Sequence, residues 1–123
     1  RYLDNWNDAR RRLAARYAAH LPASLIKPVE QLESHHVYHL YVVRVAHREQ
    51  FRQAMQAAGV ATAIHYPAAV HQQPAYQGGN IICHSMTTTE QILPQIVTLP
   101  MYPQLTAEQA LTICQAATQA LGA

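Results

Sequence analysis

The chain has 123 residues and a formal net charge of +2, and half of its residues are hydrophobic. This length fits one small domain. Alanine supplies much of the hydrophobic fraction, so we expect a thin core with few large side chains and a surface that suits a partner. The weak net charge argues against nucleic-acid binding, which needs an extended basic stripe. No apolar run approaches the roughly 20 residues of a membrane span.

The two cysteines indicate the redox environment in which the protein is found. Cys83 falls in an expected loop and Cys114 on the apolar side of an expected helix, with no C-x-x-C pair. We therefore expect two free thiols in a reducing environment. The sequence has no signal peptide, so we expect a cytoplasmic protein. The chain starts at Arg1, without methionine and already within a helical pattern, which favours a piece of a longer protein.

The first expected element is an amphipathic helix from Arg1 to about His20. Its apolar residues recur at helical spacing, and its arginines lie largely off that stripe. Pro22 marks its end. Residues 22–34 then form an exposed connector that carries the only lysine, Lys27, as a solvated side chain. The apolar stripe consists of Leu3, Trp6, Ala9 or Arg10, Leu13 and Tyr17.

A strand and a helix follow the connector. Residues 37–45 are rich in β-branched and aromatic side chains on both faces, which predicts a central strand covered on both sides. Residues 48–58 predict a helix with Phe51, Met55 and Ala58 on its buried face. The glycine that comes next is the expected C-terminal cap of this helix.

Polar side chains gather in the stretch after that glycine. Residues 60–66 alternate between two faces and predict another strand. Pro67 cannot donate a ladder hydrogen bond, so we expect the chain to leave the sheet there. His65 and Tyr66 then lie at a strand end and His71 on the following loop, where binding residues concentrate.

A loop, a short helix, a strand and a long helix complete the chain. Residues 72–86 show little periodicity and predict a loop. A capping box at residues 87–90 predicts a helix, which Pro94 interrupts, and residues 96–99 predict a short strand. A proline-rich turn and a second capping box at residues 106–109 lead into the last helix. The expected buried stripe of that helix is Ala110, Ile113, Cys114, Ala117 and Leu121.

These elements predict an α+β fold. We expect a small antiparallel or mixed sheet of about three strands with helices packed on it. Residues 1–123 are expected to form a single domain, because no repeat, low-complexity tract or long linker divides them.

Eight histidines raise the question of a metal site. On a strand, His35 and His36 point to opposite faces, and His35 and His39 lie about 13 Å apart at some 3.3 Å per residue. These three side chains therefore cannot surround one ion. Loop histidines without fixed spacing or a nearby carboxylate form a weaker alternative, so we expect no metal. That alternative set is His65, His71 and His84.

The sequence contains no other catalytic signature that we can identify. It has no G-x-S-x-G elbow and no Walker loop. Cys83 and His84 are neighbours in sequence, but catalytic pairs are set by the fold and not by adjacency. We therefore expect no catalytic residue in this chain.

Four stretches, in order along the chain, resemble one family. They are residues 13–21, the run YHLYVVR at 38–44, the HYP…H…PAY segment at 65–76 and the run LPMYPQLT at 99–106. Together they are similar to the DegT/DnrJ/EryC1/StrS family of pyridoxal-phosphate-dependent sugar aminotransferases. The resemblance extends over nearly the whole chain.

The resemblance implies a homodimeric enzyme with an aspartate-aminotransferase-like fold. In that fold a large N-terminal domain holds pyridoxal phosphate and the lysine that forms its Schiff base. This chain matches only the smaller C-terminal domain, and Lys27 does not match that lysine. We therefore expect no cofactor bound to the chain alone, and no activity. Two residues depart from the family pattern: Ala69, where a second proline is common, and Pro94.

The resemblance also implies a role for the loop after the expected third strand. In the complete enzyme this loop would lie beside the active site and shape the pocket for a nucleotide-linked keto sugar. That sugar would receive an amino group from an amino acid, with glutamate as the expected donor. Imidazole and phenol groups suit this task because they form hydrogen bonds without a full charge. The expected substrate-binding residues are His65, Tyr66, His71 and Tyr76.

A second interpretation stays open on the residues alone. A free-standing α+β domain that binds a ligand or a partner without catalysis would show the same composition and periodicity. The order of the family-like stretches favours the aminotransferase interpretation.

Overall fold

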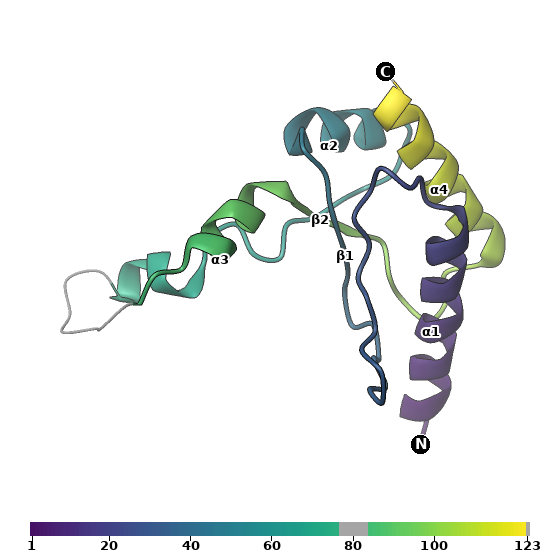
Figure 1. Cartoon of the computed structure of the whole chain (residues 1–123). Coiled ribbons are helices and arrows are strands. Elements are labelled where there is room, and N and C mark those ends of the chain that lie inside the picture. Colours follow the sequence, from purple (N-terminus) through teal and green to yellow (C-terminus); the bar gives the residue numbers. More distant parts are fainter. Residues whose placement is uncertain (77–83, 123) are drawn as a thin grey trace.

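The computed structural model describes residues 1–76 and 84–122. Within these ranges the chain has an α+β fold with a two-stranded antiparallel sheet, which confirms the expected class. Figure 1 shows the arrangement of the helices around the sheet. The elements are α1 (Leu3–His20), β1 (Tyr41–Arg44), α2 (Arg48–Ala57), η1 (Val70–Gln72), η2 (Pro74–Tyr76), α3 (Thr87–Ile92), η3 (Leu93–Gln95), β2 (Ile96–Leu99) and α4 (Ala107–Gly122).

Helix α1 packs on α4 through the second half of its apolar stripe. Leu13 and Tyr17 are buried there, and the Tyr17 hydroxyl donates a hydrogen bond of 2.7 Å to the Pro100 carbonyl. The first half of the stripe is largely left uncovered by the described residues, since Leu3 and Trp6 are 62% and 44% exposed. The helix is therefore confirmed, but only part of its expected buried face is buried.

Strand β1 is shorter than the sequence predicts. It begins only at Tyr41, because Tyr38 has a left-handed backbone with φ of 48° and its amide donates to the ring of His36 at 2.8 Å. One face is fully buried through Tyr41 and Val43, whereas the other face is half-buried. The expectation of a long strand covered on both sides is wrong for the chain by itself.

Among the residues that the structure describes, the sheet has two strands, β1 and β2, in place of about three. Tyr41 lies opposite Leu99 in an antiparallel register. The expected strand at residues 60–66 pairs with β2 only at Ala63, whose amide and carbonyl form hydrogen bonds of 3.1 and 2.8 Å with Thr98. A full third strand is therefore not confirmed among the described residues.

Helix α2 ends as the sequence predicts. Gly59 adopts φ of 78°, its amide donates to the Gln56 carbonyl at 3.0 Å, and the Val60 amide donates to the Met55 carbonyl at 2.9 Å. These two bonds form a Schellman motif, which satisfies the last carbonyls of the helix. Val60 is buried beside Met55, whereas Ala58 is exposed although its spacing placed it on the buried face.

The two predicted capping boxes differ in outcome. At α4, the Gln109 amide donates to the Thr106 hydroxyl at 3.2 Å and the Thr106 amide donates to the Gln109 side chain at 2.9 Å, so this box is present. At α3, the helix starts after Met86 with no side-chain cap, so this box is wrong. Pro94 ends α3 as expected, through the 3-10 turn η3.

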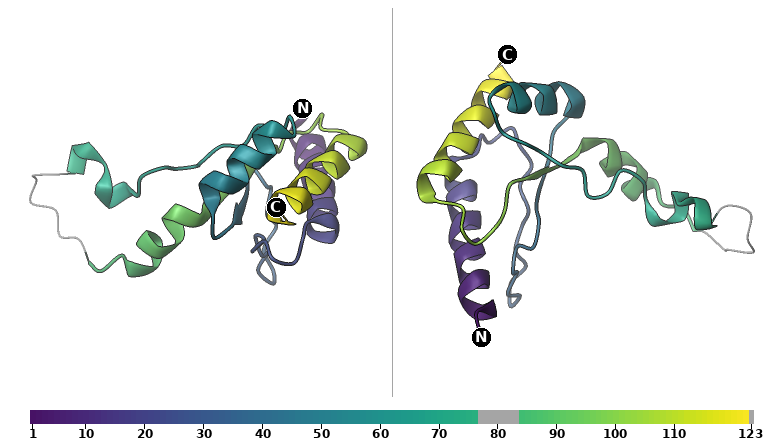
Figure 2. Two further views of the ribbon diagram at one scale, coloured as in Figure 1. Left: turned by 90° about the horizontal axis from the view of Figure 1, so that it is seen from above. Right: turned by 180° about the vertical axis from the view of Figure 1, so that it is seen from behind.

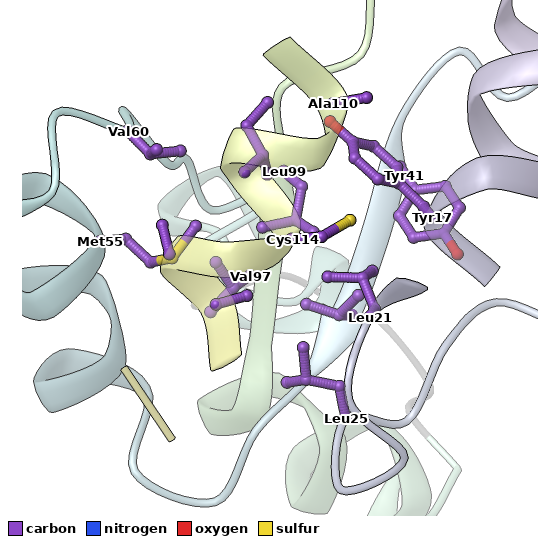
Figure 3. Packing of buried hydrophobic residues seen from close by; sticks show 14 of the residues in the cluster. Tyr17, Leu21, Leu25, Tyr41, Met55, Val60, Val97, Leu99, Ala110 and Cys114 are labelled. Carbon is purple, nitrogen blue, oxygen red and sulfur yellow. The ribbon is translucent and has the colours of Figure 1, made fainter. Parts of the chain in front are cut away.

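The core lies between the sheet and helices α1, α2 and α4 (Figure 3). Tyr17, Tyr41 and Phe51 are among its largest fully buried side chains. Cys114 is buried beside the tyrosines and is a free thiol, as expected. Burial raises the pKa of this thiol, which makes it unreactive. Cys83 lies outside the described residues.

Lys27 is not the solvated side chain that the sequence predicts. Its Nζ donates hydrogen bonds of 3.0 Å to the carbonyls of Ala18 and Leu21 at the end of α1. A cation at this end of a helix satisfies open carbonyls and complements the helix dipole. The exposed connector is therefore attached to the helix that precedes it.

We call the sheet and helices α1, α2 and α4, with the core between them, the body of the molecule. An arm extends away from this body, as both views in Figure 2 show. We define the arm as residues 68–76, which contain η1 and η2, and residues 84–93, which contain α3. The predicted loop at 72–86 thus has short helical turns in its first part. None of the helices in the described part of the chain is long and apolar enough to cross a membrane.

Candidate functional site

The two limbs of the arm share a hollow of about 840 Å³. Its lining is mainly apolar and comes from both limbs, with Ala69 and Val70 on the first and Met86 and Leu93 on the second. Pockets of this size and character are typical of small-molecule sites. The hollow is therefore the candidate functional site.

Three of the four expected site residues line this hollow: Tyr66, His71 and Tyr76. Tyr66 and Tyr76 are 66% and 47% exposed, so their rings and hydroxyls are accessible. The structure therefore brings together residues that the sequence places up to ten positions apart. His65 is not part of the lining.

His65 is attached to the sheet beneath the arm. Its Nδ1 lies 3.0 Å from the hydroxyl oxygen of Thr98, a buried residue of β2. Its ring meets that of Tyr66 edge to face, with 5.5 Å between the ring centroids. His65 thus fixes the place where the arm leaves the body and supports Tyr66 at the entrance to the hollow.

His71 is attached to the opposite limb of the arm. Its Nε2 lies 3.0 Å from Oε1 of Glu90 on α3, and the imidazole is 19% exposed. The sequence assigned Glu90 to a helix cap and gave no signal for this contact, because the two residues are 19 positions apart. Glu90 is therefore a member of the site that the sequence missed.

Two arginines attach the base of the arm to the body. Nη1 of Arg48 donates to the Leu93 carbonyl at 2.8 Å, and Arg44 donates from Nη2 to the Gln95 side chain at 3.0 Å. The Val45 amide adds a bond of 2.9 Å to the Gln95 carbonyl. These contacts set the direction in which the second limb leaves the sheet, and the sequence did not identify them.

The described residues give no support for a metal site. Among the described residues, no three histidine, cysteine, aspartate or glutamate side chains are grouped so that they could hold an ion. His65 and His71 are hydrogen-bonded to different partners, Thr98 and Glu90.

The residues of this chain do not fit pyridoxal phosphate either. The cofactor needs an amine that can form a Schiff base, and Lys27 is the only lysine in the sequence. Its Nζ is engaged with two carbonyls at the end of α1 and does not line the hollow. We therefore derive no chemical step through the cofactor from this chain.

Known proteins resemble this chain closely in sequence. Two curated relatives are each 36% identical: dTDP-3-amino-3,4,6-trideoxy-alpha-D-glucose transaminase of Streptomyces venezuelae and dTDP-3-amino-3,6-dideoxy-alpha-D-galactopyranose transaminase of Aneurinibacillus thermoaerophilus. Each alignment covers 94% of this chain and 31% of the relative. The chain therefore spans about a third of the length of these relatives.

Solved structures show the same relationship. The crystal structure of DesV from S. venezuelae in complex with a ketimine intermediate has a TM-score of 0.88 at 35% identity, and the match covers 97% of this chain and 33% of DesV. Ntda from Bacillus subtilis, with the cofactor PMP bound, has a TM-score of 0.79 at 25% identity, with coverage of 96% and 29%.

The family profile extends over almost the whole chain. It matches residues 1–118, which include the stretches from the first helix to the LPMYP turn on which the resemblance was based. The chain belongs to the DegT/DnrJ/EryC1/StrS aminotransferase family.

Proposed function

We propose that this chain is the C-terminal domain of a pyridoxal-phosphate-dependent aminotransferase that acts on a nucleotide-linked keto sugar. Family membership and the sugar transaminases among the relatives support this proposal. The complete enzyme is proposed to be a homodimer that takes its amino group from an amino acid. When bound, the cofactor supplies the amino-group transfer, and the part of the enzyme outside this chain holds it.

The observation that carries the proposal is the convergence of Tyr66, His71 and Tyr76 on one apolar hollow. Aromatic rings pack on the apolar faces of a sugar, while phenol and imidazole groups form hydrogen bonds with its hydroxyls. A hollow of about 840 Å³ has room for a sugar and part of its nucleotide. The role of the arm is therefore to bind and orient the sugar.

The proposal separates the two halves of the reaction. The first half involves the amino acid that gives the amino group, and the second involves the keto sugar that accepts it. A side chain that contacts only the sugar affects the second half alone. His71→Ala in the complete enzyme is therefore expected to lower kcat/KM for the keto sugar about tenfold, the value of one hydrogen bond. The first half-reaction should keep its rate. Single-turnover measurements of each half, together with the melting temperature, test this.

His65→Ala and His39→Ala complete the experiment. His65 supports Tyr66, so its loss should weaken the sugar half-reaction and also lower the melting temperature, because the buried Thr98 hydroxyl loses its partner. His39 is exposed and lies outside the arm, so its replacement should change neither quantity. Equal losses in both half-reactions for His71→Ala, with a lower melting temperature, would return His71 to a purely structural role.

A further inference from the structure

The contact between His71 and Glu90 determines which ring nitrogen carries the proton. Oε1 of Glu90 lies 3.0 Å from Nε2 of His71. An ionised carboxylate only accepts hydrogen bonds, so Nε2 must be the donor. In the neutral imidazole the other nitrogen, Nδ1, then carries a lone pair and acts as an acceptor.

Glu90 is available for this contact because α3 starts without a capping box. In a capping box the glutamate side chain turns back to the start of its own helix. Here the Glu90 amide donates to the Met86 carbonyl at 2.9 Å and no side chain caps the helix. The carboxylate therefore reaches across the arm to His71. His71 lines the hollow, whereas Glu90 does not.

We propose that Glu90 is a positioning residue that fixes the tautomer and the ring orientation of His71. His71 then presents Nδ1 as a hydrogen-bond acceptor, and its partner is a donor group of the bound sugar, a hydroxyl. In this tautomer Nδ1 carries no proton that it could donate to a phosphate oxygen, so His71 is assigned to the sugar and not to the diphosphate. This inference rests on the proposed function, in which the hollow receives the sugar.

The tautomer can be measured directly, without any substrate. Selective ¹⁵N labelling of histidine in the complete protein, at a pH where the imidazole is neutral, reports which nitrogen is protonated. The His71 signals are assigned by their loss in His71→Ala. We expect a protonated Nε2 and an unprotonated Nδ1 in the wild type. In Glu90→Ala both nitrogens should move toward averaged shifts, because the carboxylate that selects the Nε2–H tautomer is then absent. A protonated Nδ1 in the wild type, or the same spectrum in Glu90→Ala, would overturn the inference.

Kinetics test whether the positioning matters for the sugar. Glu90→Ala removes the oxygen that accepts the Nε2–H of His71. We expect it to raise KM for the keto sugar about two- to tenfold, the value of one hydrogen bond. The first half-reaction and the melting temperature should not change. Glu108→Ala on α4 is the matched control, since Glu108 is exposed and lies outside the arm.

The outcomes separate this inference from the proposed function. If His71→Ala leaves the sugar half-reaction unchanged, the proposed function of the arm fails, whatever Glu90 does. If His71→Ala weakens that half-reaction but Glu90→Ala leaves its KM unchanged, only the positioning role fails. A fall of both half-reactions and of the melting temperature in Glu90→Ala would show that Glu90 has a structural role and contradict the positioning role.

Discussion

Glu30 connects the segment after α1 to that helix through contacts with three groups. Its Oε1 accepts hydrogen bonds from Nη1 of Arg11 at 2.6 Å and from the His36 amide at 2.9 Å. Its Oε2 lies 3.4 Å from the Tyr38 hydroxyl. The hydrogen bond from Arg11, followed by that from His36, lowers the pKa of Glu30 from its usual 4.5 to about 2. The carboxylate therefore stays charged in acid that would neutralise an unpaired one.

This lowered pKa predicts how stability depends on pH. A carboxyl group with a lower pKa in the folded state stabilises that state above its unfolded pKa, and the contribution is lost as pH falls toward the folded pKa. The window here runs from about pH 4.5 down to about pH 2. In Glu30→Gln the melting temperature should therefore fall less steeply across this window than in the wild type. Thermal melts from pH 7 to pH 2 measure this.

A control variant tests the specificity of that effect. Glu108→Gln removes an exposed carboxylate on α4. Its melting temperature should follow the pH profile of the wild type. If Glu30→Gln and Glu108→Gln show the same profile, the cluster around Glu30 does not stabilise the fold.

Local signals in the sequence correctly predicted where α2 ends and where α4 begins. The glycine after α2 and the capping box before α4 both form as expected, because each needs only residues three to five positions apart. The same kind of signal failed at α3. There the competing partner of Glu90 was His71, 19 residues away in sequence. A cap is therefore predictable only where no distant side chain competes for it.

The cap of α2 makes a quantitative prediction. Gly59 has φ of 78°, and a Cβ added there would meet no atom within 4 Å. The cost of Gly59→Ala is therefore purely conformational, about 1 kcal/mol. The melting temperature should fall by about 3–5 °C. Gly122→Ala is the matched control, because Gly122 lies in α4, also has open space around it and has no positive φ.

Only Gly59→Ala should lower the melting temperature. Alanine is a better helix former than glycine, so Gly122→Ala should leave the melting temperature unchanged or raise it slightly. A fall of the same size in both variants would show that the loss comes from something other than the backbone conformation at Gly59.

At the scale of the molecule, one end of the body carries an uncovered apolar surface. Tyr2, Leu3 and Trp6 at the start of α1 are 59%, 62% and 44% exposed, with the rings of Tyr2 and Trp6 stacked at 6.1 Å. Val29 and Leu32 in the connector are 85% and 94% exposed. Exposed apolar surface of this kind is typical of contact sites between proteins or domains.

This surface predicts self-association when the 123-residue chain is produced alone. Burial of the exposed rings and aliphatic groups against a second copy is favourable by about 25 cal/mol per Å² of apolar area. Sedimentation over a range of concentrations should show species larger than a monomer. The double variant Leu3→Ser/Trp6→Ser should shift the distribution toward the monomer.

Gln115→Ser on the exposed face of α4 is the control for this prediction and should leave the distribution unchanged. A strictly monomeric chain at high concentration, with Trp6 fluorescence typical of a buried indole, would contradict the prediction. It would show that Trp6 is covered within the chain.

The sequence by itself determined the fold class, the positions of the main helices and of β2, and the family. Helical periodicity, turn prolines and the cap before α4 are local, so their physical causes lie within a few residues of each other. The HYP…H…PAY run also identified the segment of the hollow that carries Tyr66, His71 and Tyr76. These features are encoded by residues that lie close together in the sequence.

Only the tertiary structure decided how distant segments meet. Thr98 holds His65 across 33 positions in sequence and Glu90 holds His71 across 19, and Lys27 caps α1 from the connector. The expected third strand is reduced to a single bridge between Ala63 and Thr98. Periodicity does not encode such contacts, since they depend on where the packed helices and sheet bring the side chains together.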